Sequence, residues 1–117
     1  MKLYGIPNCN TVKKARVWLS EQGQTVEFHD FKKQGVSEAL LKNWVKLAGW
    51  EKLVNRKGTT WRQLPDGIKN SIDNEAAAIQ LMMEKSSVIK RPVLENNGKI
   101  AVGFDETIYQ EMLSQPN

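Results

Sequence analysis

The fold of this chain is decided by residues 4–15, which read YGIPNCNTVKKA. The apolar residues before Pro7 predict a short β-strand, and the apolar residues from Val12 onward recur at helical spacing. Cys9 is therefore expected at a strand-to-helix junction, near the positive end of the helix dipole. A thiolate is stabilised there and the thiol pKa falls. Such a junction suits a nucleophile, and its backbone N–H groups suit an anionic substrate.

The rest of the chain continues the alternation of strands and helices. Apolar periodicity, Gly and Pro positions and a Ser cap predict a second strand, a helical middle and a C-terminal hairpin followed by a helix. The first half is predicted to hold a strand at 1–6, a helix from Cys9 to Gly23, a strand at 26–29 and a helix from Ser37 to Gly49. An irregular stretch with short helical turns follows at 50–72, and then a helix after Asp73 or Asn74. The last elements are hairpin strands at 92–95 and 99–102 around Asn96-Asn97-Gly98, and a helix at 106–113.

This order predicts an α/β fold with a small mixed sheet and helices on both faces. The helical middle, about residues 36–88, is interpreted as an insertion packed on the same core. Residues 1–117 are therefore expected to form a single domain, and 117 residues suffice for one core.

Composition restricts the classes of partner. Net charge is +4, but the basic residues are spread and no long cationic run occurs. Four tryptophans at helical spacing suit helix packing better than base stacking, so we expect no direct contact with nucleic acid. No apolar run is long enough to span a bilayer and no secretory signal is evident, which predicts a cytoplasmic protein without membrane contact. A lone cysteine fits a reducing compartment.

Other common sites find no support in the sequence. His29 is the only histidine, and its place near the end of the second strand favours an ordinary surface residue over a partner of Cys9. No cluster of His, Cys, Asp and Glu has metal-ligand spacing, and no phosphate-binding or dinucleotide-binding glycine motif is present. We expect neither a metal nor a bound cofactor.

Several residues beside Cys9 have two interpretations. Lys13 lies one helical turn from Cys9, where it either lowers the thiol pKa or is a surface lysine. Helix capping is favoured over anion binding for the polar residues around the cysteine, Asn8, Asn10 and Thr11.

Two arginines are candidates for binding an anion. Arg56 lies beside a Gly-Thr turn, and both a solvated role and an anion-binding role are open for it. Arg91 stands directly before Pro92, and this position favours a functional role.

Three motifs in this order resemble the ArsC family, which includes glutaredoxin-coupled arsenate reductases, Spx-type transcription regulators and YffB-like reductases. They are Pro7-Asn8-Cys9-Asn10-Thr11, Asn55-Arg56-Lys57-Gly58-Thr59 and Lys90-Arg91-Pro92-Val93, and the resemblance covers essentially the whole chain. It implies a thioredoxin-like fold with a helical insertion between a βαβ half and a ββα half. It also implies that Cys9 is the nucleophile, that Arg56 and Arg91 hold an oxyanion, and that Pro92 matches the cis-proline which presents backbone groups to a peptide substrate.

The sequence departs from two branches of that family. The segment 102–106, which resembles the place of the third oxyanion arginine in the arsenate reductases, contains no basic residue, and their His-x3-Cys-x3-Arg pattern is Gly5-x3-Cys9-x3-Lys13 here. The Spx regulators often carry a Cys-x-x-Cys switch, but in this chain Val12 occupies the place of the second cysteine. The pattern is most similar to the YffB-like members.

This similarity implies a glutathione-dependent thiol reductase with Cys9 as its single nucleophilic cysteine. Glutathione is the expected co-substrate and glutaredoxin a further candidate partner. Two alternatives stay open: an Spx-like regulator that binds RNA polymerase, and a weak glutaredoxin-coupled arsenate reductase.

Overall fold

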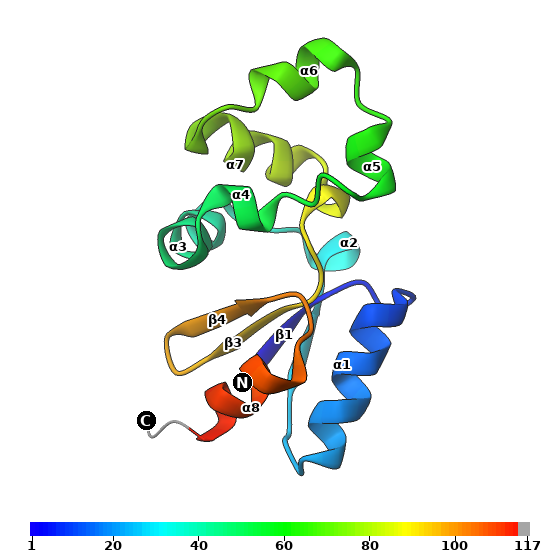
Figure 1. Cartoon of the computed structure of the whole chain (residues 1–117), viewed down its shortest axis with the longest axis vertical. Helices are drawn as coiled ribbons and strands as arrows, with labels where there is room; N and C mark the ends of the chain where they lie inside the picture. Colours follow the sequence, from blue (N-terminus) through cyan, green and yellow to red (C-terminus); the bar gives the residue numbers. More distant parts are fainter. Residues whose placement is uncertain (115–117) are drawn as a thin grey trace. The chain divides into compact units, whose positions relative to one another are not determined.

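The computed structural model describes residues 1–114 and divides into two compact units (Figure 1). Residues 1–34 and the chain from residue 91 onward form the first unit, and residues 35–90 form the second. Whether the chain behaves as the single domain expected from the sequence stays a prediction.

The first unit is built on a four-stranded sheet in the order β2-β1-β3-β4. The strands are β1 (Lys2–Gly5), β2 (Glu27–Asp30), β3 (Val93–Asn96) and β4 (Lys99–Val102). β1 runs parallel to β2 and antiparallel to β3, and β3 is antiparallel to β4. A parallel pair needs a crossover, and helix α1 (Asn10–Glu21) supplies it. The predicted mixed sheet is confirmed.

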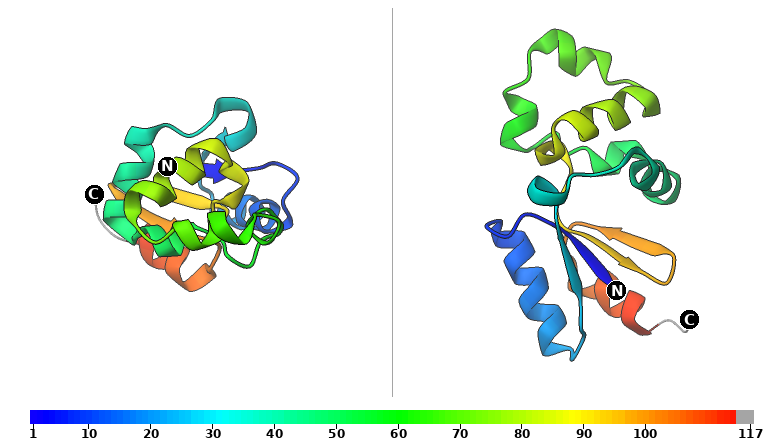
Figure 2. Two further views of the ribbon diagram at one scale, coloured as in Figure 1. Left: turned by 90° about the horizontal axis from the view of Figure 1, so that it is seen from above. Right: turned by 180° about the vertical axis from the view of Figure 1, so that it is seen from behind.

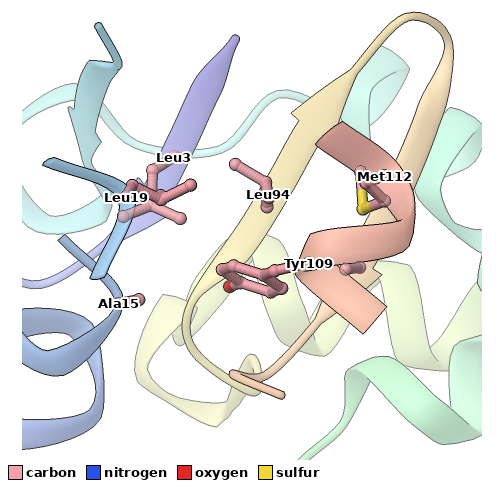
Figure 3. Close-up of a cluster of buried hydrophobic side chains, with 7 residues drawn as sticks. Leu3, Ala15, Leu19, Leu94, Tyr109 and Met112 are labelled. Atoms are coloured by element: carbon pink, nitrogen blue, oxygen red, sulfur yellow. The ribbon is translucent and has the colours of Figure 1, made fainter. Parts of the chain in front are cut away.

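One face of this sheet carries the core of the unit. Leu3 of β1 and Leu94 of β3 are opposite each other in the register, and both are fully buried. They pack against Ala15 and Leu19 of α1 and against Tyr109 of α8 (Glu106–Ser114), as Figure 3 shows. The apolar stripe predicted from the sequence therefore faces the sheet, and burying each large side chain contributes about 1.5–3 kcal/mol.

Alternation along β1 places Tyr4 on the opposite face from Leu3. The Tyr4 hydroxyl donates a 2.8 Å hydrogen bond to Glu95 Oε1, and burial together with this carboxylate raises the pKa of Tyr4. The ring of His29 lies 4.8 Å from the Tyr4 ring, centroid to centroid. His29 is half-buried, so the expectation of an ordinary surface histidine is wrong: parallel pairing of β1 with β2 sets it directly beside Tyr4.

The hairpin between β3 and β4 turns at Asn97 and Gly98, both with positive φ (53° and 77°). A two-residue turn with two left-handed residues matches the right-handed twist of the strands, and Asn-Gly is its preferred sequence. The predicted hairpin is confirmed, with a register that pairs Asn96 with Lys99.

The second unit is helical (Figure 2). Its elements are α3 (Glu38–Ala48), α4 (Trp50–Leu53), α5 (Thr59–Arg62), α6 (Asp66–Ser71), α7 (Glu75–Glu84) and the 3-10 turn η1 (Ser86–Val88). Ser37 Oγ caps α3 by accepting the N–H of Leu40 at 3.2 Å, and Asn74 Oδ1 caps α7 by accepting the N–H of Ala77 at 2.9 Å. Both predicted helix starts are confirmed.

Two short elements were not predicted. Helix α2 (Phe31–Gln34) follows β2 directly, and its start is held by Asp30 Oδ1, which accepts the N–H of Lys32 at 2.9 Å. Four residues do not show a helical period, so neither α2 nor η1 has a pattern to detect. Among the helices of residues 1–114, none is both long enough and apolar enough to cross a membrane.

Candidate active site

Cys9 is the N-cap residue of α1, in extended conformation (φ −85°, ψ 127°). Its N–H donates to the carbonyl of Ile6 at 3.2 Å, and this hydrogen bond closes the turn after β1. Its carbonyl accepts the N–H of Lys13 at 2.9 Å, which is the first hydrogen bond of the helix. The side chain is half-buried. The strand-to-helix placement predicted for the thiol is therefore observed.

The capping role expected of Asn8, Asn10 or Thr11 is wrong, because Cys9 itself occupies the N-cap position. Asn10 and Thr11 are the first two residues of the helix, and Asn8 precedes the cap. All three side chains are exposed around the thiol. Their alternative role, donation to a bound anion, stays a prediction, as does the effect of the exposed Lys13.

Gly5 lets the first turn of α1 come down on the end of β1. A Cβ at Gly5 would lie 2.8 Å from Val12 Cγ2, closer than real Cβ contacts. Val12 is fully buried. The absence of a side chain at Gly5 therefore allows the first turn of α1 to pack closely against the end of β1. The N–H groups of that turn, which have no intrahelical acceptor, lie next to Cys9.

The pKa of Cys9 is lowered from its ordinary value. Partial burial acts in the opposite direction and raises it, but the backbone N–H of Val12, a side-chain hydrogen bond from Arg91 and the backbone N–H of Thr11 together outweigh burial. The Cys9 side chain makes no capping hydrogen bond of standard geometry, so the two N–H groups act on the sulfur mainly as fixed dipoles. A lowered pKa raises the fraction of thiolate, which is the nucleophilic form.

Arg91 reaches Cys9 from the start of β3, where the Arg91-Pro92 peptide bond is cis. The Pro92 carbonyl accepts the N–H of Gly103 at 2.7 Å, and the Gly103 carbonyl accepts the Tyr109 hydroxyl at 2.7 Å. Tyr109 is fully buried, and this burial raises its pKa, so the hydroxyl remains a donor. A chain of hydrogen bonds thus ties Pro92 to the core.

The structure brings Cys9 and Arg91 together within the first unit. Arg56 belongs to the second unit, where it is exposed beside Trp50 and Trp61. The supporting roles of Gly5 and Tyr109 were not predicted from the sequence. A glycine at the end of a buried strand is a usable signal of close helix approach, whereas nothing local to Tyr109 indicates its partner.

The residues present do not suggest a metal. Within residues 1–114 no group of three or more His, Cys, Asp or Glu side chains is arranged to hold an ion. The chemistry available at Cys9 is therefore that of a thiolate beside a guanidinium and two backbone N–H groups: attack on an electrophilic sulfur or on an oxyanion centre.

The βαβ half, the ββα half and the cysteine at the start of α1 define a thioredoxin-like protein with a single thiol. The ArsC family model matches residues 4–112, and the chain belongs to the ArsC family. A Haemophilus influenzae protein without an assigned function is 40% identical over 108 residues, covering 92% of this chain and 94% of that one.

Solved structures agree with this assignment. A protein described as YFFB is 45% identical with a TM-score of 0.92, and the match covers 97% of this chain and 98% of that one. An arsenate reductase (ArsC) related protein from Brucella melitensis is 44% identical with a TM-score of 0.75, covering 97% and 94%. More distant is the Bacillus subtilis regulatory protein MgsR, 27% identical over 108 residues, covering 90% of this chain and 83% of that protein.

Proposed function

We propose that this ArsC-family protein is a glutathione-dependent thiol reductase that uses Cys9 as its only nucleophile. The observation that carries the proposal is the lowered pKa of Cys9 beside Arg91, in a chain with no second cysteine. A reactive thiolate without an internal resolving thiol requires an external one. Glutathione, a small thiol with two carboxylates, fits this requirement and the basic side chain at the site, and glutaredoxin is a further candidate reductant.

The proposed cycle has two thiol–disulfide exchanges. The Cys9 thiolate attacks the glutathione sulfur of a mixed disulfide RS–SG, which forms Cys9–S–SG and releases RS⁻, and RS⁻ takes a proton from water. A molecule of glutathione then attacks the glutathione sulfur of the adduct. The attacking glutathione thiol gives its proton to solvent, glutathione disulfide leaves, and the Cys9 thiolate is restored. Overall, RS–SG and one molecule of glutathione give RSH and glutathione disulfide, so the R thiol is released in reduced form and one glutathione is oxidised to the disulfide level.

Arg91 supports both steps of this cycle. Its guanidinium stabilises the Cys9 thiolate as attacking group in the first step and as leaving group in the second. A planar guanidinium also pairs with a carboxylate through two hydrogen bonds, so it fits either carboxylate of glutathione. The role of Arg56 in the same chemistry is a prediction from the family resemblance.

The test uses the purified full-length protein and the Cys9→Ser variant. Incubation with glutathione disulfide, followed by mass spectrometry, is expected to give one glutathione adduct on the wild-type protein and none on the variant. Excess glutathione is expected to remove that adduct, and a glutathionylated peptide substrate is expected to turn over catalytically. A wild-type protein that forms no adduct, or an adduct that glutathione does not release, rejects the proposal.

The relative MgsR, a regulatory protein, supports a second candidate, a regulator. The resemblance to the Spx regulators implies RNA polymerase as the partner of such a protein. Such an adaptor is expected to keep its partner in the Cys9→Ser variant, whereas the reductase loses all turnover. Binding of purified RNA polymerase to both the wild-type protein and Cys9→Ser, in the absence of any glutathione turnover, would favour the regulator. An arsenate reductase is the third candidate, and arsenate-dependent oxidation of glutathione in the presence of glutaredoxin tests it.

A further inference from the structure

Arg56 lies beside two tryptophans in the second unit, Trp50 and Trp61. Its guanidinium carbon is 5.5 Å from the centroid of the Trp50 ring and 5.8 Å from that of Trp61. Both distances fall within the range of a cation–π interaction, and both indoles are half-buried while Arg56 is exposed. An exposed arginine ordinarily samples many rotamers, so contact with two rings restricts it.

Trp50 is held by the framework of the second unit. It is the first residue of α4, after Gly49, whose positive φ of 88° ends the preceding helix. At the other end of α4, Leu53 is fully buried and its carbonyl accepts the N–H of Lys90 at 2.7 Å. The short helix is thus fixed at both ends, and with it the first of the two rings.

The turn that carries Arg56 is also fixed. The N–H of Asn55 donates to the Val88 carbonyl at 2.8 Å, its carbonyl accepts the N–H of Gly58 at 3.2 Å, and its Oδ1 accepts the N–H of Lys57 at 3.2 Å. A Cβ at Gly58 would lie 2.9 Å from Asn55 Nδ2, so a larger residue there would require the Asn55 side chain to shift. Gly58 is in turn the N-cap of α5, which carries Trp61.

The surroundings of Arg56 favour an anion. Residues 52–62 contain four basic side chains and no acidic one: Lys52, Arg56, Lys57 and Arg62. A cation–π contact depends on the charge of the guanidinium, whereas an anion binds through the N–H groups along its edge. The two kinds of contact are therefore compatible, and Arg56 is exposed, so its N–H groups are accessible to an anion.

We propose that Trp50 and Trp61 are positioning residues that hold the Arg56 guanidinium ready to bind an anionic group of the carboxylate or oxyanion class through two parallel hydrogen bonds. The inference rests on the proposed function for the identity of the anion, which would be a carboxylate of glutathione. That Arg56 binds an anion at all is what the family resemblance implies. Its physical content, that two indoles restrict one guanidinium and so strengthen its binding of anions, is independent of turnover.

The first experiment records the Arg56 Nε–H signal and the indole N–H signals by NMR at low ionic strength, with inorganic phosphate as the probe. In the wild-type protein we expect an Arg56 signal shifted by ring currents, which Trp50→Leu and Trp61→Leu each move toward the free-arginine position. Each variant is expected to weaken phosphate binding about two- to five-fold, the factor that corresponds to one exposed cation–π contact. Trp61→Phe, which retains a ring, is expected to lose less.

Matched controls separate positioning from general stability. Trp18→Leu removes another half-buried tryptophan, from the first unit, and is expected to leave the Arg56 signal and phosphate binding unchanged. In an Arg56→Gln background, Trp50→Leu and Trp61→Leu are expected to have no further effect on phosphate binding. Arg62→Gln removes the same charge from the same unit and is expected to leave the Arg56 signal shifted. An unshifted Arg56 signal in the wild type, or tryptophan effects that persist in full without Arg56, overturns the proposal.

A second experiment measures KM and kcat of the glutathione reaction. If the glutathione reaction proceeds, Trp50→Leu and Trp61→Leu are expected to raise KM about two- to five-fold with kcat unchanged, since they weaken ground-state and transition-state binding alike. An unchanged KM in both variants overturns the role of the two rings in substrate binding. If the wild type shows no glutathione reaction, the proposed function fails, and the NMR experiment still decides whether the tryptophans position Arg56.

Discussion

The side chain of Arg91 hydrogen-bonds the sulfur of Cys9, joining the start of β3 to the start of α1. The two residues come from opposite ends of the chain, and the antiparallel pairing of β1 with β3 brings them together. This contact places a permanent positive charge beside the thiol, where it favours the thiolate over the thiol.

Arg91→Gln is therefore expected to raise the pKa of Cys9, because the variant loses both the charge and the charged donor. The pH at half-maximal iodoacetamide alkylation should move upward, and alkylation at pH 7 should slow. Arg91→Lys, which keeps the charge but not the planar fork, is expected to give an intermediate profile. Arg16→Gln is the control, because it removes an arginine from α1, the helix that Cys9 caps, but one that contacts another residue. The Arg16 guanidinium lies 4.4 Å from the centroid of the Phe28 ring in β2. An unmoved profile in Arg91→Gln would contradict the assignment.

Gly5→Ala tests the close approach of α1 to β1. The added methyl group meets Val12 Cγ2, and the stiff, buried valine has to move with the first turn of the helix. We expect the free energy of unfolding to fall by about 1–3 kcal/mol, as for other overpacked sites. Because the Val12 N–H moves away from the sulfur, the pKa of Cys9 is expected to rise.

Gly67→Ala is the matched control for this variant. Gly67 lies in α6 with no heavy atom within 4 Å of a Cβ placed there. Alanine favours a helix over glycine by up to about 1 kcal/mol, so this variant should be neutral or slightly more stable. Urea denaturation of both variants gives the comparison. Equal stability of Gly5→Ala and wild type would show that Val12 has room to yield.

Local patterns account for what the sequence could predict. The apolar alternation of Leu3, the helical spacing from Val12 to Leu19 and the Asn97-Gly98 turn each leave a periodic or conformational signature, and those elements are observed where expected. Position before a helix also sufficed to single out Cys9. The contact of the His29 ring with the Tyr4 ring depends on strand register, which no local pattern contains.

Long-range support of the site was beyond the sequence for the same reason. The hydrogen bonds from Tyr109 to Gly103 and from Gly103 to Pro92 join a helix, a loop and a strand start. Each partner alone is an ordinary residue, and their relation exists only once β4 has returned the chain beside β3. The contact of Arg56 with Trp50 and Trp61 likewise depends on how two short, aperiodic helices fold.

Tyr109→Phe removes the first link of that hydrogen-bonded chain. The Gly103 carbonyl loses a buried donor, and leaving such an acceptor unsatisfied costs about 1–3 kcal/mol of stability. We also expect faster hydrogen exchange at the Gly103 amide, which donates to Pro92. Tyr4→Phe is the control, because it removes the only other tyrosine hydroxyl without touching Gly103. A Gly103 amide as protected as in the wild type would contradict this relay.

The lowered pKa of Cys9 also makes a prediction about stability. In the unfolded chain the thiol titrates near its ordinary pKa of 9.0, and in the folded protein its pKa is lower. Below the folded-state pKa both states hold the proton, and the thiolate adds nothing. As pH rises above that value, the folded state releases its proton first and gains stability, until the unfolded-state pKa is passed and the full gain is reached. The Cys9→Ser variant lacks this titration. The free energy of unfolding of the wild type minus that of Cys9→Ser, measured under reducing conditions, is therefore expected to increase with pH between the two pKa values and then to level off. A difference that is flat or falls with pH would mean that the folded protein does not favour the thiolate, and the nucleophile assigned to Cys9 would lose its physical basis.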